Sequence, residues 1–136
     1  MRRSIVLVAL LGFLPGLAQA RGVNVTQPAE IISAVNNAKP GDVITVAPGH
    51  YELPGLRMRT AGTAQHPIVL RAAKAGTVEF RSSATEFIKI SAPDWIVENL
   101  EIAGTCPNDS DCEHAFHSVV PPDRTIIRDN RIRDYN

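Results

Sequence analysis

Short strand-like runs recur along this chain at a near-constant interval, and that interval restricts its fold more than any other feature. The clearest pair is DWIVENLEI, which begins at Asp94, and RTIIRDNRI, which begins at Arg124. In each run apolar residues fall at alternate places, and Asn or Asp follows. A period of about 30 residues is typical of a stacked β-solenoid, in which each repeat builds one coil.

The rest of the chain supports this architecture over other all-β folds. From Asp42 onward the apolar residues have a period of two, in VITV, LRMR, IVLRA, VEFRS, FIKIS, WIVENLEI, FHSV and TIIRDNRI. These runs lie too close together for intervening helices, which excludes a βαβ sheet. Two-residue Asn-Gly or Asp-Gly turns are absent, so the usual signal of antiparallel hairpins is missing. The pattern therefore predicts an all-β parallel β-helix.

Like residues are expected to stack from coil to coil. We predict one wall with Ile44, Leu70 and Ile90, and another with Phe80, Ile96 and Ile126. Asn99, Asp129 and Asn130 follow strand residues, where such side chains satisfy backbone groups at a bend.

A short helix is predicted to cap the first coil. In QPAEIISAVNNAKPGD, Pro28 suits the first helical position, and Ile31, Ile32, Val35 and Ala38 form one apolar face. Pro40 and Gly41 then end the helix. We therefore expect a capping helix over residues 28–39 and about four coils over residues 42–136.

The first 20 residues are typical of a secretory signal peptide. Arg2 and Arg3 precede an apolar stretch, and Ala18-Gln19-Ala20 forms a small-residue cleavage site. The alternative, a membrane anchor, is disfavoured because a spanning helix needs about 20 apolar residues. We expect residues 1–20 to be removed and residues 21–136 to be exported to the periplasm or the cell exterior, without membrane insertion. The 14 basic and 14 acidic residues balance, which argues against a nucleic-acid partner.

Cys106 and Cys112 enclose the polar segment PNDSD. In an oxidising compartment, two cysteines so close in sequence are best interpreted as a disulfide that holds this loop. The alternative is a zinc site that also uses His114 and His117, because zinc accepts these ligand types. The C-x5-C-x-H-x2-H spacing matches no established zinc pattern, so the disulfide is favoured.

Asp109, Asp111 and Glu113 form an acidic cluster in and beside the same loop. Carboxylate oxygens suit calcium, so the three residues are weak candidates for a metal site. The twelve-residue EF-hand pattern is absent, and a solvated acidic loop is the favoured interpretation.

Cationic side chains alternate with apolar ones in several runs, which places them on the outside of the solenoid. There they are candidates for binding an anionic polymer, while the simpler interpretation is that they keep the strands soluble. His114 and His117 are candidate general bases because imidazole titrates near neutral pH, although most loop histidines have no such role. The substrate-binding candidates are Arg57, Arg59, Arg71, Lys89, His114 and His117.

Three longer segments carry a family resemblance: NNAKPGDVITVAPGHYE, GTAQHPIVLRA and FIKISAPDWIVENLEIAG. They resemble the N-terminal coils of right-handed parallel β-helix proteins of the pectate-lyase-like superfamily. The chondroitinase B and alginate lyase group, polysaccharide lyase family six, is the most similar, over residues 28–136. Lys39-Pro40-Gly41-Asp42 and Gly62-Thr63-Ala64 match segments that build the cap and the turns in that group.

This resemblance implies an enzyme that cleaves uronic-acid polymers by β-elimination, with calcium and cationic side chains neutralising the substrate carboxylate. The resemblance also places the reacting groups on later coils, so no catalytic residue is assigned here. The predicted function is the N-terminal portion of an exported anionic-polysaccharide lyase. The alternatives are a non-catalytic polysaccharide-binding or surface module and an inactive fragment.

The pattern stops at Asn136 without a capping segment, so we expect a truncated solenoid. An open end exposes unpaired strand edges, and self-association through the last coil is the consequence we predict.

Overall fold

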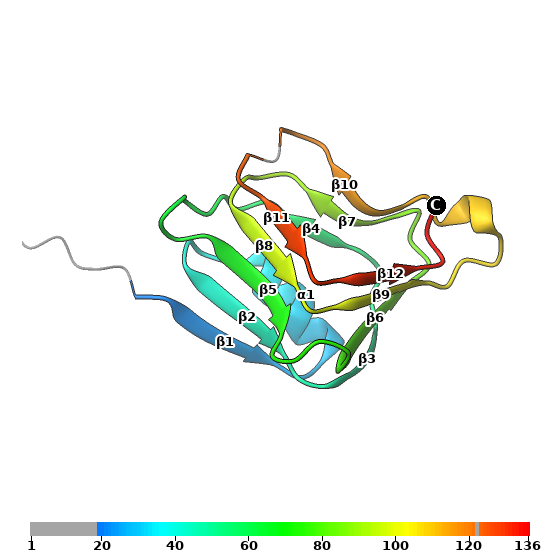
Figure 1. Ribbon diagram of the computed structural model, residues 1–136, viewed down its shortest axis with the longest axis horizontal. Coiled ribbons are helices and arrows are strands. Elements are labelled where there is room, and N and C mark those ends of the chain that lie inside the picture. The colour runs from blue at the N-terminus through cyan, green and yellow to red at the C-terminus, as the bar shows by residue number, and fades with distance from the viewer. Residues whose placement is uncertain (1–18, 122) are drawn as a thin grey trace, which may run out of the picture.

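A computed structural model describes residues 19–121 and 123–136 (Figure 1). The predicted signal peptide therefore lies almost wholly outside the described residues. Within the described part, the strands form three sheets. Sheet A contains β1 (Arg21–Val25), β2 (Asp42–Val46), β5 (Ile68–Ala72), β8 (Trp95–Glu98) and β11 (Ile126–Arg128). Sheet B contains β3 (Gly49–Glu52), β6 (Val78–Ser82), β9 (Glu101–Gly104) and β12 (Arg131–Arg133), and sheet C contains β4 (Leu56–Met58), β7 (Glu86–Ile90) and β10 (His114–Ser118).

All strand pairs are parallel, and each joins a strand to its counterpart one coil away. The chain runs through sheets A, B and C in turn, as β2, β3 and β4, then β5, β6 and β7, then β8, β9 and β10. β11 and β12 continue this order. The fold is thus a right-handed parallel β-helix, as predicted. Ile126 pairs with Ile96 and Ile132 with Ile102, so the two runs that revealed the repeat do stack on each other.

The predicted stacking was only partly right. Ile44 lies over Leu70, and Ile96 lies over Ile126 in the same sheet. Ile90 instead belongs to sheet C, between Met58 and Ser118. Phe80 belongs to sheet B, between Tyr51 and Ile102. The connections between strands differ in length, so a mean period predicts the coils but does not assign each strand to its sheet.

Inward side chains of the three sheets fill the interior of the solenoid. The Phe80 ring meets Tyr51 and Phe87 edge-on, with centroids 6.1 and 6.3 Å apart. Trp95 is fully buried, and its indole Nε1 donates a hydrogen bond of 2.8 Å to the carbonyl of Thr60. Burying a large apolar side chain contributes about 1.5 to 3 kcal/mol, so this stack is the main source of stability.

Helix α1 (Pro28–Asn36) covers the end of the solenoid beside β1, β2 and β4, opposite β11 and β12 (Figure 1). Its first turn is fixed by Glu30, whose carboxylate accepts hydrogen bonds from the backbone N–H groups of Thr26 and Gln27 at 2.7 and 3.2 Å. The helix ends three residues before the predicted position 39. Both the backbone N–H and the side-chain amide of Asn37 bond to the carbonyl of Ser33, which closes the last turn. No helix among the described residues is long and apolar enough to cross a membrane.

The Lys39 to Asp42 segment forms the turn into the first strand of the first coil. The buried carboxylate of Asp42 accepts hydrogen bonds from the backbone N–H of Lys39 at 2.9 Å and from Arg21 at 2.6 and 2.8 Å. Burial alone would raise the pKa of Asp42, but the Arg21 guanidinium and the Lys39 N–H hold it below its usual value. This carboxylate therefore links the cap turn to β1 in its charged form.

Sharp corners join the strands of sheets A and B. Asn99 and Asp129, which occupy equivalent places in successive coils, have positive φ angles of 63° and 55°. Asn130 bridges two coils, because its amide donates to the carbonyl of Val97 at 2.8 Å and accepts from the N–H of Leu100 at 3.0 Å. Asn99 also bonds to a backbone group, since its amide donates to the carbonyl of Ala72 at 3.4 Å. Asn99 and Asn130 thus satisfy backbone groups at the corners, as predicted, whereas Asp129 contributes its positive φ angle.

Gly62, in the Gly62-Thr63-Ala64 segment, lies where two coils approach each other closely. Its N–H donates to the carbonyl of Pro93 at 3.1 Å. A Cβ at this position would lie 2.5 Å from the carbonyl oxygen of Asp94 and 3.0 Å from the nitrogen of Ile68. Backbone atoms surround the site, so the clash could be relieved only by moving one coil relative to the other.

We expect Gly62→Ala to lower the free energy of unfolding by about 1 to 3 kcal/mol, because it overpacks two backbone segments. Gly22→Ala is the matched control: its Cβ would meet nothing within 4 Å. That control should change stability by less than about 0.5 kcal/mol. Urea denaturation of the two variants measures the difference, and equal midpoints would contradict the proposed close approach.

Candidate functional site

The strand β7 departs from regular alternation at two adjacent apolar residues. Phe87 and Ile88 are both fully buried, so Glu86 and Lys89 both face outward although they are three residues apart. In a regular strand, residues three apart point to opposite faces. The sequence E-F-I-K therefore brings a carboxylate and an ammonium group together, and Glu86 Oε2 lies 2.5 Å from Lys89 Nζ.

The next strand, β10, has the same irregularity. Ala115 is buried and Phe116 is half-buried, so His114 and His117 both face outward. Strand pairing passes from His114 with Glu86 directly to Phe116 with Ile88, and then to His117 with Lys89. The two strands thus carry matching polar, apolar, apolar, polar segments in register.

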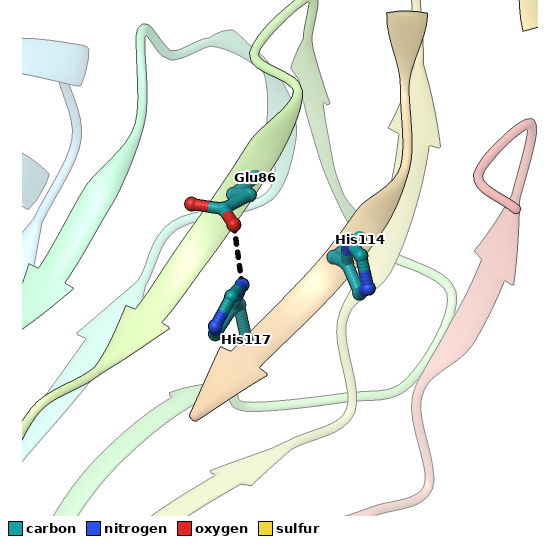
Figure 2. Close-up of side chains that lie close together, drawn as sticks. All are labelled: Glu86, His114 and His117. Carbon is teal, nitrogen blue, oxygen red and sulfur yellow. Dashed lines mark ion pairs between the residues drawn. The ribbon is translucent and has the colours of Figure 1, made fainter. Parts of the chain in front are cut away.

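These outward side chains form one cluster on sheet C. In Figure 2 the Glu86 carboxylate points toward the ring of His117, and its Oε1 lies 2.5 Å from His117 Nδ1. The rings of His114 and His117 have centroids 5.3 Å apart and are tilted by 51°. The hydrogen bond from Lys89, aided by the charge of His117, lowers the pKa of Glu86 below its usual value.

A groove of about 380 Å³ runs beside this cluster, between α1 and sheet C. Arg57, on β4, is in register with Lys89 and hence with His117 two strands away. Arg59 directly follows β4 and lines the same groove. The groove is lined by Ile32, Asn36, Pro54, Gly55, Leu56, Arg57, Arg59, Glu86, Phe87 and Lys89.

The arginines in this groove differ from most of those elsewhere in the described part of the chain. Arg57 and Arg59 are exposed and have no ion-pair partner among the described residues. Of the remaining described arginines, only Arg131 shares this property. The others pair with carboxylates: Arg21 with Asp42, Arg71 with Glu98, Arg81 with Glu52 and Glu79, Arg124 with Asp94, Arg128 with Glu98, and Arg133 with Glu79 and Asp134.

Five of the six predicted substrate-binding residues therefore gather on sheet C or directly after β4. Arg71 does not: it lies on sheet A, with Nη1 3.9 Å from Glu98 Oε1 and Nε 3.4 Å from Thr45 Oγ1. Sequence reasoning missed Glu86, which joins the groove to the histidines. Its signal is the pair of adjacent apolar residues in E-F-I-K, repeated in H-A-F-H, which departs from the period of two predicted for these strands.

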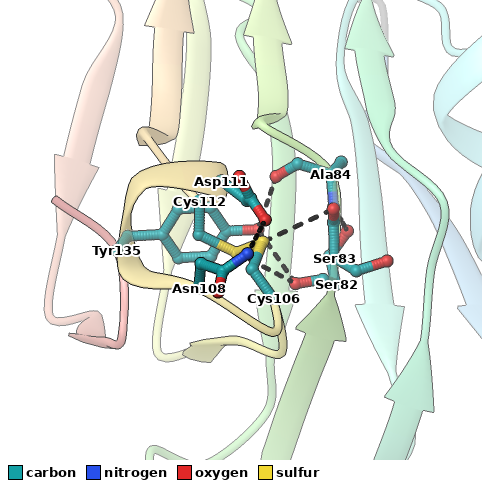
Figure 3. Close-up of a disulfide and its surroundings, with 8 residues drawn as sticks. All are labelled: Ser82, Ser83, Ala84, Cys106, Asn108, Asp111, Cys112 and Tyr135. Carbon is teal, nitrogen blue, oxygen red and sulfur yellow. Dashed lines mark hydrogen bonds between the residues drawn. A yellow bond between two sulfur atoms is a disulfide. The ribbon is translucent and has the colours of Figure 1, made fainter.

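Cys106 and Cys112 form the predicted disulfide, with Cα atoms 5.7 Å apart (Figure 3). The thiolate-containing zinc site is thereby excluded. Cys106 Sγ and Cys112 Sγ lie 3.5 and 3.8 Å from the carbonyl oxygens of Ser83 and Ser82, which precede β7. The Tyr135 hydroxyl donates to the carbonyl of Ser82 at 3.3 Å.

The disulfide loop also positions β10. Directly after Cys112, the backbone N–H groups of Glu113 and His114 both donate to the carbonyl of Thr85, at 3.0 and 2.9 Å. Because Thr85 precedes Glu86, these bonds fix the beginning of β10 beside the beginning of β7. His114 is therefore held against Glu86 by the backbone.

The acidic cluster in the loop stays a prediction. The loop contains η1 (Asp109–Asp111), and the side chain of Asp109 lies outside the described part of the chain. Asp111 accepts a hydrogen bond of 3.0 Å from the amide of Asn108, and Glu113 lies 3.8 Å from Nδ1 of His114.

Comparison with known proteins gives the family. The sequence profile named Chondroitinase B matches residues 25–116. The chain belongs to this family. No curated protein matches its sequence.

Solved structures similar to this family member are alginate lyases. One, the PL6 family alginate lyase AlyGC, is 26% identical over 65% of this chain, with a TM-score of 0.54. A variant of that lyase is 23% identical over 82% of the chain, with a TM-score of 0.64. An alginate lyase from a Paenibacillus species is 23% identical over 85%, with a TM-score of 0.55. The matches span only 12%, 15% and 44% of those chains. The predicted relationship to polysaccharide lyase family six is confirmed.

Removing the disulfide should lower the free energy of unfolding by about 2 kcal/mol. The reason is that the unfolded chain gains conformational entropy when a loop of this length is no longer closed. The test is urea denaturation of the wild-type chain with and without a reducing agent. The double variant Cys106→Ser, Cys112→Ser is the control and should not respond to the reductant. Equal stability of the oxidised and reduced chains would contradict the role assigned to this bond.

Proposed function

We propose that this chain is the N-terminal portion of an exported anionic-polysaccharide lyase, and that its groove on sheet C holds uronate units of the polymer. The observation that carries the proposal is that Arg57 and Arg59, in a groove that also contains Lys89, have no ion-pair partner within residues 19–121 and 123–136. A cation without an intramolecular partner is available to an external carboxylate. The family and the alginate-lyase neighbours support the substrate class.

The spacing of these cations suits a polymer with regularly repeated carboxylates. Arg57 and Lys89 stand on neighbouring parallel strands, about 4.8 Å apart along the solenoid axis. Arg57 and Arg59 are two residues apart along the chain, which separates them by about 7 Å. Guanidinium groups bind carboxylates through two parallel hydrogen bonds, so the arginines would give orientation as well as charge.

In this proposal the groove contributes binding, and proton removal belongs to groups on other coils. β-Elimination requires that the uronate carboxylate be neutralised while a base removes the adjacent proton. Cations in the groove fit the first requirement. The disulfide and the family favour an oxidising compartment, so we place the protein in the periplasm or outside the cell.

A non-catalytic polysaccharide-binding module is the second candidate, because an arginine-lined groove would serve binding without any reaction. Self-association stays a prediction. Its support is the exposure of Ile126, Ile127 and Ile132 on β11 and β12.

Retention on a polymer tests binding by this chain, and release of product tests whether the chain by itself also carries out the reaction. We expect the chain to be retained on immobilised alginate, chondroitin or pectate without releasing unsaturated uronate, as a binding portion of a lyase would be. Release of unsaturated product by the chain alone would show that it also contains the reacting groups. Absence of both retention and product on all three polymers would contradict the proposal.

Substitution should locate the binding surface. Arg57→Gln and Arg59→Gln should each weaken retention about two- to fivefold, since an exposed charge contact contributes up to about 1 kcal/mol. Arg71→Gln is the matched control, because it removes the same charge from sheet A. Added salt should weaken wild-type retention more than that of the groove variants. An equal effect of all three substitutions would mean that net charge, and not the groove, determines binding.

A further inference from the structure

We propose that Glu86, His114 and His117 form a binding site for a divalent transition-metal ion of the zinc type. Each of the three side chains offers one ligand atom, and these atoms all lie within 4.8 Å of one another. The inference concerns the chain's own chemistry with a metal ion and does not depend on polysaccharide binding.

The geometry requires only small side-chain movements. Zinc bonds to imidazole nitrogen and carboxylate oxygen are about 2.1 Å long, so ligand atoms around a tetrahedral ion lie about 3.3 Å apart. Glu86 Oε1 and His117 Nδ1 are 2.5 Å apart, closer than this, and His114 lies within the 4.8 Å limit. Both imidazoles belong to β10 and face outward (Figure 2), and rotation of the two rings would bring all three atoms to bonding distance.

The backbone holds the three residues in place without the ion. Glu86 and His114 are paired in register on adjacent strands, and His117 is one pair further along. Thr85 accepts the N–H of His114 at 2.9 Å. The disulfide lies two residues before His114. Ligands fixed on paired strands form a more defined site than ligands on a loop.

The three ligand groups indicate which kind of metal ion the site would bind. Two imidazoles and one carboxylate suit zinc and similar ions, and three protein ligands leave a fourth position for water or a substrate group. Calcium takes six to eight oxygen ligands, which these residues do not supply. This site is therefore different from the calcium site that the family resemblance implied.

The His117 ring already places a ligand nitrogen beside Glu86. Its Nδ1 is buried and lies 2.5 Å from Glu86 Oε1, with which it pairs when the ring is charged. A metal ion would bind this nitrogen in place of the ring proton, since only an unprotonated nitrogen has a lone pair to donate.

Two neighbouring cationic side chains, Lys89 and Arg57, oppose the binding of a metal ion at this site. Lys89 Nζ lies 2.5 Å from Glu86 Oε2, and Arg57 follows in the same row. A metal ion must share the carboxylate with Lys89 or displace it. Removal of Lys89 should therefore strengthen metal binding, whereas the same change should weaken retention on a uronate polymer. We therefore expect one substitution of Lys89 to raise the affinity for the metal ion and to lower the affinity for the polymer.

The test is calorimetric titration of the chain, prepared without a histidine tag, with Zn²⁺ alone. We expect saturable binding of one ion per chain. Glu86→Gln, His114→Gln and His117→Gln should each weaken affinity at least tenfold, and Lys89→Gln should increase it. His50→Gln is the matched control, because His50 forms a similar pair with Glu79 on sheet B, with Nδ1 3.4 Å from Oε1. That control should leave affinity unchanged.

Two further measurements separate a loss of metal binding in the variants from a loss of folding. Bound Co²⁺ should give the visible absorption of a four-coordinate nitrogen and oxygen site, and Glu86→Gln should abolish it. Zn²⁺ should also raise the unfolding temperature of the wild-type chain but not of the three ligand variants. Absence of saturable Zn²⁺ binding, or binding that persists in all three variants, would overturn the proposal. Because no polysaccharide is present, neither result bears on the groove.

Discussion

The parallel backbone ladder between coils is the constraint on which the rest of this structure depends. It holds neighbouring strands about 4.8 Å apart and places each residue against its counterpart one coil away. Inside, the ladder stacks Tyr51, Phe80 and Ile102 into a core. Outside, it aligns Arg57, Lys89 and His117 in a row. The strand register therefore aligns most of the candidate site, and the disulfide loop fixes the beginning of β10 beside β7.

Charge is distributed unequally over this framework. On sheets A and B most outward arginines face a carboxylate within two coils, as Arg128 faces Glu98 in the neighbouring coil and Arg133 faces Glu79 two coils away. Such pairs reduce the positive potential of those faces. On sheet C, Glu86 is engaged by Lys89 and His117, and Arg57 and Arg59 have no counterpart among the described residues. This contrast distinguishes one face of an otherwise balanced chain.

The sequence predicted the coils, the capping helix and the disulfide because each depends on local patterns. It did not assign Ile90 and Phe80 to their sheets, since that depends on how much chain each connection uses. It also missed Glu86, because Phe87 and Ile88 both turn inward and shift the outward positions by one residue. Only the pairing of β7 with β10, where the same shift recurs, shows that Glu86, His114 and His117 lie together.

The most direct test of the central claim, that sheet C is the binding face, is to map amide chemical-shift changes while titrating the chain with a uronate oligomer. The account predicts that the largest changes occur in β4, β7 and β10 and in the residues around Arg59. Changes confined to the outer faces of sheets A or B would contradict it, as would the absence of any change at concentrations at which the polymer retains the chain.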